Sequence, residues 1–151
     1  MRHFGMLVPS TNTTNEIEYG RLAPALQVHT ARLGKGGDTP FSPSKEEDVT
    51  YQAKLLGDAR VEVIVLVQTS ASLFADDYDA ATVKRMTEAS GVPSLTSAQA
   101  LGRALKALKA SKIAMATPYS EEVIGRARRY YETKYGVETV ASESQIGRAH
   151  V

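Results

Sequence analysis

Polar side chains directly follow three apolar runs of this sequence, in positions where they could bind a small anion. Hydroxyl and amide groups donate hydrogen bonds to carboxylate or phosphate oxygens, and several such donors can stabilise negative charge that develops during a reaction. The local alternative is that a single Ser, Thr or Asn in such a place caps the helix that follows. The three groups are Ser10 and Asn12 in residues 9–14, then Gln68, Thr69 and Ser70, and finally Tyr119 in residues 117–119.

The residues before these groups predict an α/β fold. Six of the seven residues in 61–67 are apolar, which is typical of a strand buried on both faces of a parallel sheet. Helical periodicity separates most of the expected strands, so we expect a doubly wound parallel sheet, a flavodoxin-like lobe, plus the start of a second similar lobe. The expected strands are 4–8, 27–32, 61–67, 92–95, 112–116 and 137–141, with helices beginning near residues 14, 44, 77, 97 and 120.

In open α/β sheets, ligands bind just beyond the carboxyl ends of the strands. We therefore expect the three polar turns to converge in one pocket for a small anion or carboxylate. Thr13 and Glu16 have the spacing of a capping box, which predicts that they cap the first helix. Residues 34–44 are rich in Gly, Pro and Ser and predict a loop that could cover a strand end.

Composition restricts the function classes. Eighteen Lys and Arg against 17 Asp and Glu give a net charge of +1, which offers no electrostatic reason to expect a nucleic-acid partner. The absence of cysteine excludes disulfides, thiolate metal sites and a cysteine nucleophile within these 151 residues. No apolar run is long enough for a membrane span, so we expect no membrane partner and a cytoplasmic location.

The domain organisation expected from this pattern is a first lobe over 1–110 and the start of a second lobe over 111–144. Residues 145–151 look foreign, because residues 146–151 are what one reading frame of a widely used sequencing adapter encodes. We expect the natural sequence to depart from this one near Ser144 and the original protein to continue, so the tail is left out of the fold prediction.

Three short motifs occur in a distinctive order. Residues 5–16 read GMLVPSTNTTNE, residues 68–72 read QTSAS and residues 116–119 read ATPY. Together they resemble the aspartate/glutamate racemase superfamily, and within it the branch of maleate cis-trans isomerases and arylmalonate decarboxylases. The resemblance implies two facing α/β lobes, no cofactor, no metal and a small carboxylic acid as substrate. A homo-oligomer is also possible.

The resemblance also implies roles for the polar turns. Asn12 would hydrogen-bond a substrate carboxylate while Ser10 shapes the turn, and Tyr119 would donate its hydroxyl to an oxyanion. Thr69 and Ser70 match the polar pair that stabilises the enediolate in the decarboxylase. The predicted catalytic residues are thus Thr69, Ser70 and Tyr119.

Gln68 departs from the pattern of the isomerases. In them, and in two-thiol racemases, this position holds the cysteine of the first lobe, whereas glutamine is neither an acid–base group nor a nucleophile. The decarboxylases also lack this cysteine and use one in the second lobe. Gln68 is therefore predicted to bind substrate with Ser10 and Asn12.

Three functions remain open from the sequence. The first is a cofactor-independent isomerase or decarboxylase-like enzyme for a small mono- or dicarboxylic acid, truncated here and without its catalytic cysteine. The second is a protein of the same fold that binds small carboxylates without catalysis. The third, a serine hydrolase using Ser70, lacks a Gly-x-Ser-x-Gly motif and has no obvious partner other than His29.

Overall fold

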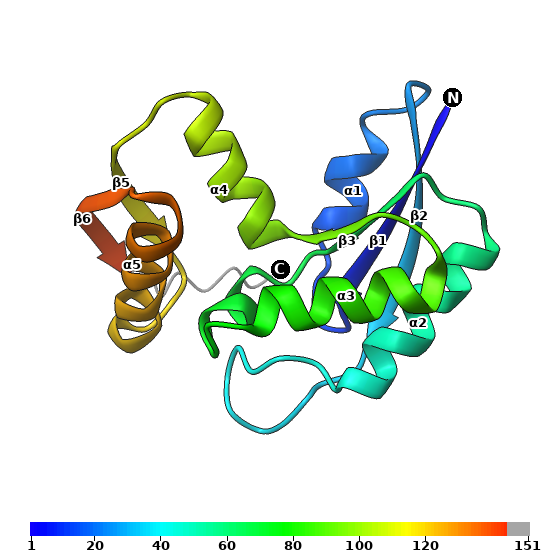
Figure 1. Ribbon diagram of the computed structural model, residues 1–151, viewed down its shortest axis with the longest axis horizontal. Coiled ribbons are helices and arrows are strands. Elements are labelled where there is room, and N and C mark those ends of the chain that lie inside the picture. Colours follow the sequence, from blue (N-terminus) through cyan, green and yellow to red (C-terminus); the bar gives the residue numbers. More distant parts are fainter. Residues whose placement is uncertain (145–151) are drawn as a thin grey trace. The chain divides into compact units, whose positions relative to one another are not determined.

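The computed structural model describes residues 1–144, which form two compact units that divide between Ala98 and Gln99 (Figure 1). The expected tail, 145–151, lies outside the described residues. The elements are β1 (Arg2–Pro9), α1 (Asn15–Gly20), β2 (Leu26–Leu33), α2 (Glu46–Asp58), β3 (Val63–Leu66), the 3₁₀ helix η1 (Thr69–Leu73), α3 (Tyr78–Ser90), β4 (Ser94–Thr96), α4 (Ser97–Ala107), β5 (Lys112–Thr117), α5 (Glu121–Tyr135) and β6 (Glu138–Ser144).

The first unit contains a four-stranded sheet in the order β2-β1-β3-β4, and all three strand pairs are parallel. β3 therefore lies inside the sheet between β1 and β4. This arrangement confirms the parallel α/β fold expected from the sequence, and its strand order is that of flavodoxin-like sheets.

Strand β1 carries helices on both of its faces. Met6, Leu7 and Val8 have no exposed surface, as expected for a strand that is covered on both sides. Leu7 belongs to the core beneath α2 and α3. Phe4 points to the opposite face, since side chains alternate along a strand, and there it stacks on Tyr19 of α1 with ring centroids 5.5 Å apart.

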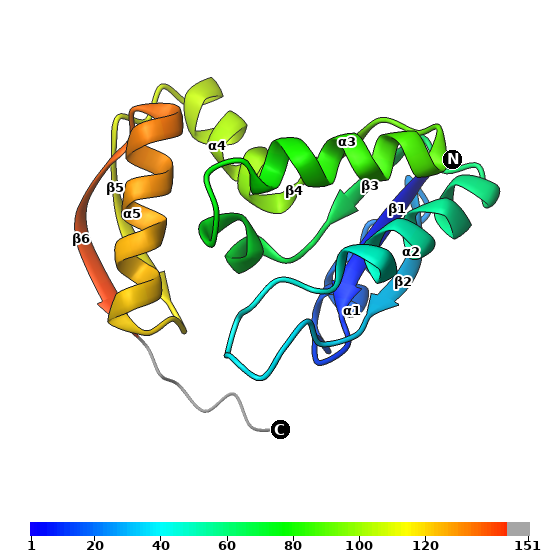
Figure 2. The same cartoon turned by 60° about the horizontal axis from the view of Figure 1, so that its bottom comes forward.

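Helices α2 and α3 lie side by side on one face of this sheet (Figure 2). Their close approach depends on Gly57, because a Cβ atom there would come within 2.4 Å of the backbone oxygen of Ser90. The buried core on this face consists of Leu7, Leu33, Val49, Ala53, Leu56, Val61, Ile64, Leu66, Met86 and Val92.

The second unit is described over residues 99–144. Strands β5 and β6 pair in parallel, and an ion pair of 3.3 Å joins Lys112 to Glu138 across them. Helix α5 ends at Gly136, which adopts the left-handed conformation with φ 67° that favours glycine. Gly102 of α4 packs against the ring of Tyr135, where a Cβ atom would come within 2.3 Å.

Most strand boundaries differ by one to three residues from the sequence expectation, and one element was not expected. Strand β3 was expected over 61–67 but ends at Leu66, although the N–H of Val67 still donates to the carbonyl of Leu7. At Gln68 the backbone turns away with φ −134° and ψ 73°, and η1 follows. Strand β4 starts at Ser94 rather than 92.

Replacing Gly57 by alanine tests the contact between α2 and α3. The added methyl group meets backbone atoms of Ser90, so the helices must move apart and the free energy of unfolding should fall by about 1–3 kcal/mol. Urea denaturation followed by circular dichroism measures this loss. Gly20→Ala is the matched control, since nothing lies within 4 Å of its Cβ position, and equal stability losses in both variants would contradict the argument.

Candidate functional site

The turns that follow β1 and β3 lie next to each other at the carboxyl end of the first unit's sheet. Leu7 of β1 is paired with Leu66 of β3, and the N–H of Val67 donates to the carbonyl of Leu7 at 2.8 Å. The chain order reverses between these two strands, and ligands bind at such a switch point, beyond the carboxyl ends of the strands. Residues 9–14 and 67–74 therefore form the candidate functional site of this unit.

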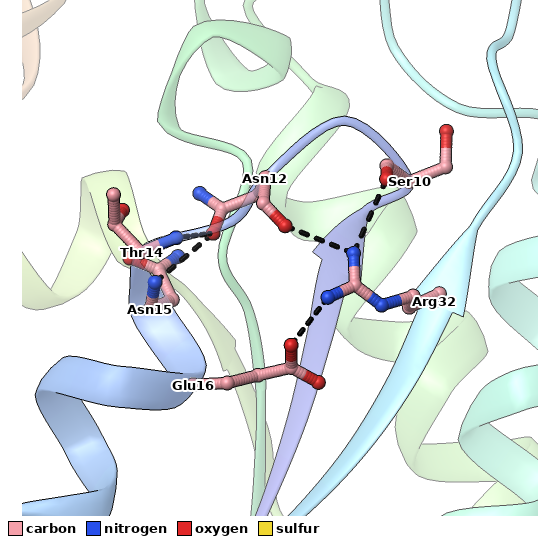
Figure 3. A network of polar contacts seen from close by, with 6 residues as sticks. All are labelled: Ser10, Asn12, Thr14, Asn15, Glu16 and Arg32. Atoms are coloured by element: carbon pink, nitrogen blue, oxygen red, sulfur yellow. Dashed lines mark hydrogen bonds and ion pairs between the residues drawn. The ribbon is translucent and has the colours of Figure 1, made fainter. Parts of the chain in front are cut away.

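Asn12 organises the turn after β1. Its side-chain oxygen Oδ1 accepts hydrogen bonds from the N–H groups of Thr14, at 3.2 Å, and Asn15, at 3.0 Å (Figure 3). Asn12 thus caps α1. The predicted capping box of Thr13 and Glu16 is wrong, because Glu16 is engaged elsewhere, in an ion pair with Arg32. The amide nitrogen of Asn12 points away from the two N–H groups that Oδ1 caps.

Arg32 of β2 fixes the same turn from the neighbouring strand. One guanidinium nitrogen donates to the carbonyls of Ser10, at 3.2 Å, and Asn12, at 2.9 Å, and the other meets the carboxylate of Glu16 (Figure 3). Arg32 was not identified from the sequence. Nothing local marks it, since its partners lie at least 16 residues away and are brought together only by the parallel pairing of β1 with β2.

The turn after β3 is tied to the segment 34–44. The amide of Gln68 accepts a hydrogen bond from the N–H of Ser44 at 3.2 Å and donates one to the carbonyl of Ser42 at 3.0 Å. Ser70, which is buried, donates its hydroxyl to the carbonyl of Phe41 at 3.2 Å. These contacts place Gln68 and Ser70 against a loop, and their predicted roles toward substrate stay predictions.

Thr69 contacts Ser97, the first residue of α4, directly after β4. Its Oγ1 lies 2.7 Å from Oγ of Ser97, and either hydroxyl could be the donor. The neighbouring Thr96 is fully buried and donates to Oδ1 of Asp79 at 2.9 Å. Asp79 was also not identified from the sequence, yet only 3% of it is exposed, and a buried carboxylate needs such a partner.

Tyr119 belongs to the second unit. Its N–H donates to Oγ1 of Thr117 at 3.3 Å, and its carbonyl accepts a hydrogen bond of 2.7 Å from the hydroxyl of Ser144. Burial raises the pKa of the Tyr119 phenol above its ordinary value, because the charged phenolate is poorly solvated there. That Tyr119 joins the turns of the first unit in one pocket stays a prediction.

The serine-hydrolase alternative does not fit the histidines. Nε2 of His29 lies 2.9 Å from Nδ1 of His3, and the two rings stack with centroids 5.1 Å apart. The hydroxyl of Ser70 meets a backbone carbonyl instead. Ser70 and His29 therefore form no nucleophile–base pair of the kind that activates a serine.

Neither a metal cluster nor a membrane-spanning helix occurs in the part of the chain that the structure describes. Within it, no group of three or more His, Cys, Asp or Glu side chains is placed to hold a metal ion. No helix there has the length and apolar character that crossing a membrane requires.

Comparisons with known proteins give a relative in sequence and solved structures of similar fold. The arylmalonate decarboxylase of Bordetella bronchiseptica is 32% identical over 121 residues, which are 79% of this chain and 50% of that protein. The structure of unliganded arylmalonate decarboxylase is similar with a TM-score of 0.79 and 27% identity, covering 95% of this chain and 60% of that one. The maleate isomerase Iso of Pseudomonas putida S16 shares the fold, with a TM-score of 0.75 at 23% identity over 94% of this chain and 63% of that one.

The length covered and the family assignment follow from these matches. This chain spans about half the length of the curated relative that it matches. The family model described as arylmalonate decarboxylase matches residues 4–146, which confirms the branch of the racemase superfamily indicated by the three motifs. The chain therefore belongs to the arylmalonate decarboxylase family.

Proposed function

We propose that this chain provides the carboxylate-binding side of a cofactor-independent enzyme that decarboxylates or isomerises a small mono- or dicarboxylic acid. The observation that carries the proposal is the adjacency of the polar turns after β1 and β3 at the switch point of the sheet. The family relationship supports the choice of substrate class, since the relatives include an arylmalonate decarboxylase and a maleate isomerase.

In this proposal, donors from both turns surround the acid. The amide nitrogen of Asn12 binds one carboxylate, while the hydroxyls of Thr69 and Ser70 face the oxygens on which charge develops. A donor that is oriented before the reaction typically contributes about 3 kcal/mol to stabilising the transition state. The hydroxyl of Ser70 must first leave the carbonyl of Phe41. Ser97 supports Thr69, since a hydrogen bond donated by Ser97 leaves the proton of Thr69 for the ligand.

Proton transfer needs a group that these turns do not contain. A thiol suits the task because its pKa can be tuned close to neutrality, but the 151 residues include no cysteine. The engagement of Gln68 with backbone groups of residues 42 and 44 favours a second candidate, a protein that binds small carboxylates without catalysis. The two candidates share the acid-binding turns and differ only in turnover.

Substitutions of Asn12 separate capping from ligand binding. Asn12→Asp keeps an oxygen acceptor for the N–H groups of Thr14 and Asn15, so stability should stay within about 0.5 kcal/mol. It replaces the amide donor by a negative charge, so the affinity for malonate should fall by at least about tenfold. Calorimetric titration with malonate and urea denaturation measure the two effects.

Asn12→Ala is the companion variant, which should lose both the affinity and about 1 kcal/mol of stability as the cap disappears. Unchanged malonate affinity in Asn12→Asp would remove Asn12 from the proposed site.

The phenol of Tyr119 should act as a donor at neutral pH. Burial raises its pKa in the folded state, so deprotonation is disfavoured there. The protonated phenol therefore contributes to the free energy of unfolding below the unfolded pKa of about 10, and this contribution is lost as the pH rises through the folded pKa. Absorbance at 295 nm reports the ionisation of tyrosine phenols as the pH is raised. In Tyr119→Phe, one phenol that ionises above pH 10 should be missing from this titration. Loss of a phenol that titrates below about pH 10 would contradict the raised pKa.

The 151-residue chain should show no turnover. Without a thiol we expect neither decarboxylation of phenylmalonate to phenylacetate nor conversion of maleate to fumarate, and proton NMR follows both reactions through their organic products. Gln68→Cys should not restore decarboxylation, since the resemblance places the thiol of the decarboxylases in the second lobe. Turnover by the unmodified chain that is lost in Ser70→Ala would overturn the thiol argument.

A further inference from the structure

The segment 34–44 between β2 and α2 closes on itself. A Cβ atom at Gly36 would come within 1.6 Å of the carbonyl oxygen of Pro43, so the two ends of the segment touch at a contact that only glycine permits. Within it, the N–H and the hydroxyl of Ser42 both donate to the carbonyl of Thr39. Phe41 adopts φ 64°, a conformation that side-chain-bearing residues rarely take without support from their surroundings.

That support comes from the turn after β3. The primary amide of Gln68 accepts from the N–H of Ser44 and donates to the carbonyl of Ser42, as a neighbouring strand would do. The hydroxyl of Ser70 adds a third hydrogen bond, to the carbonyl of Phe41. Cysteine in place of Gln68 could not make the paired contact, because a thiol is a weak donor and a weak acceptor at a single atom.

We propose that Gln68 is a positioning residue that latches the segment 34–44 to the carboxyl end of β3 and thereby controls access to the acid-binding turns. The location of those turns rests on the proposed function, whereas the latch rests on the three hydrogen bonds alone. Gln68 then binds the backbone of the segment 34–44. This role accounts for the amide side chain at a position where isomerases of the superfamily carry a thiol.

Limited proteolysis of the full chain measures the latch, because the segment contains an exposed trypsin site at Lys35. Gln68→Ala should raise the rate of cleavage after Lys35 by roughly 10- to 30-fold, since each lost hydrogen bond shifts the opening equilibrium by about fivefold. Gln68→Met should give the same increase, as it keeps the length of the side chain and removes both contacts. Ser70→Ala should give an increase of about fivefold.

Two internal comparisons make the result specific. Gln52→Ala removes a glutamine of similar burial from α2 and should leave the cleavage rate after Lys35 unchanged. Cleavage after Lys54 and Lys84, in helices α2 and α3, reports global opening, and its rate should also stay unchanged in the Gln68 variants.

The proposal is overturned if both Gln68 variants are cut after Lys35 at the rate of the unmodified chain. It is equally overturned if only Gln68→Ala is cut faster, which would indicate a cavity, or if the helix sites accelerate in parallel, which would indicate general destabilisation. Because no ligand enters this assay, failure of the latch and failure of the malonate titrations with the Asn12 variants are separate results.

Discussion

The parallel hydrogen-bond ladders on both sides of β1 are the constraint on which the rest of the first unit depends. Pairing with β2 runs along the whole strand, and pairing with β3 runs from Phe4 to Leu7, so over these residues β1 has a hydrogen-bonded neighbour at both edges. These ladders set the register in which β1 and β3 end. They also bring Arg32 of β2 against the turn that contains Asn12.

The strands and α-helices of this fold could be predicted from local patterns, whereas η1 and the contacts between elements could not. The apolar run at 61–67 indicated a buried strand correctly, because a strand covered on both faces leaves no polar alternation. The capping box at Thr13 and Glu16 failed because a long-range ion pair with Arg32 competes for the glutamate. Spacing along the chain does not reveal such a competitor.

The sequence predicted which residues belong to the candidate site. The structure adds which groups of the protein each of their side chains contacts. Asn12, Gln68, Thr69 and Ser70 all have hydrogen-bond partners in the chain itself. The partners of Gln68 and Ser70 in residues 41–44 were not predictable, since a Gly- and Pro-rich loop has no periodicity from which its contacts can be inferred. Side chains held in this way are oriented before any ligand arrives, which is what an anion-binding site requires.

The hydroxyl of Ser70 has one proton, and the carbonyl of Phe41 already accepts it. If an acid carboxylate claims that proton, the segment 34–44 loses one of its three attachments, so the ligand and the closed loop compete in a thermodynamic linkage. Linkage is reciprocal: acid binding weakens loop closure by the same factor by which loop closure weakens acid binding. Because of this one serine, the change in loop closure on acid binding and the change in acid affinity on loop closure measure the same coupling free energy.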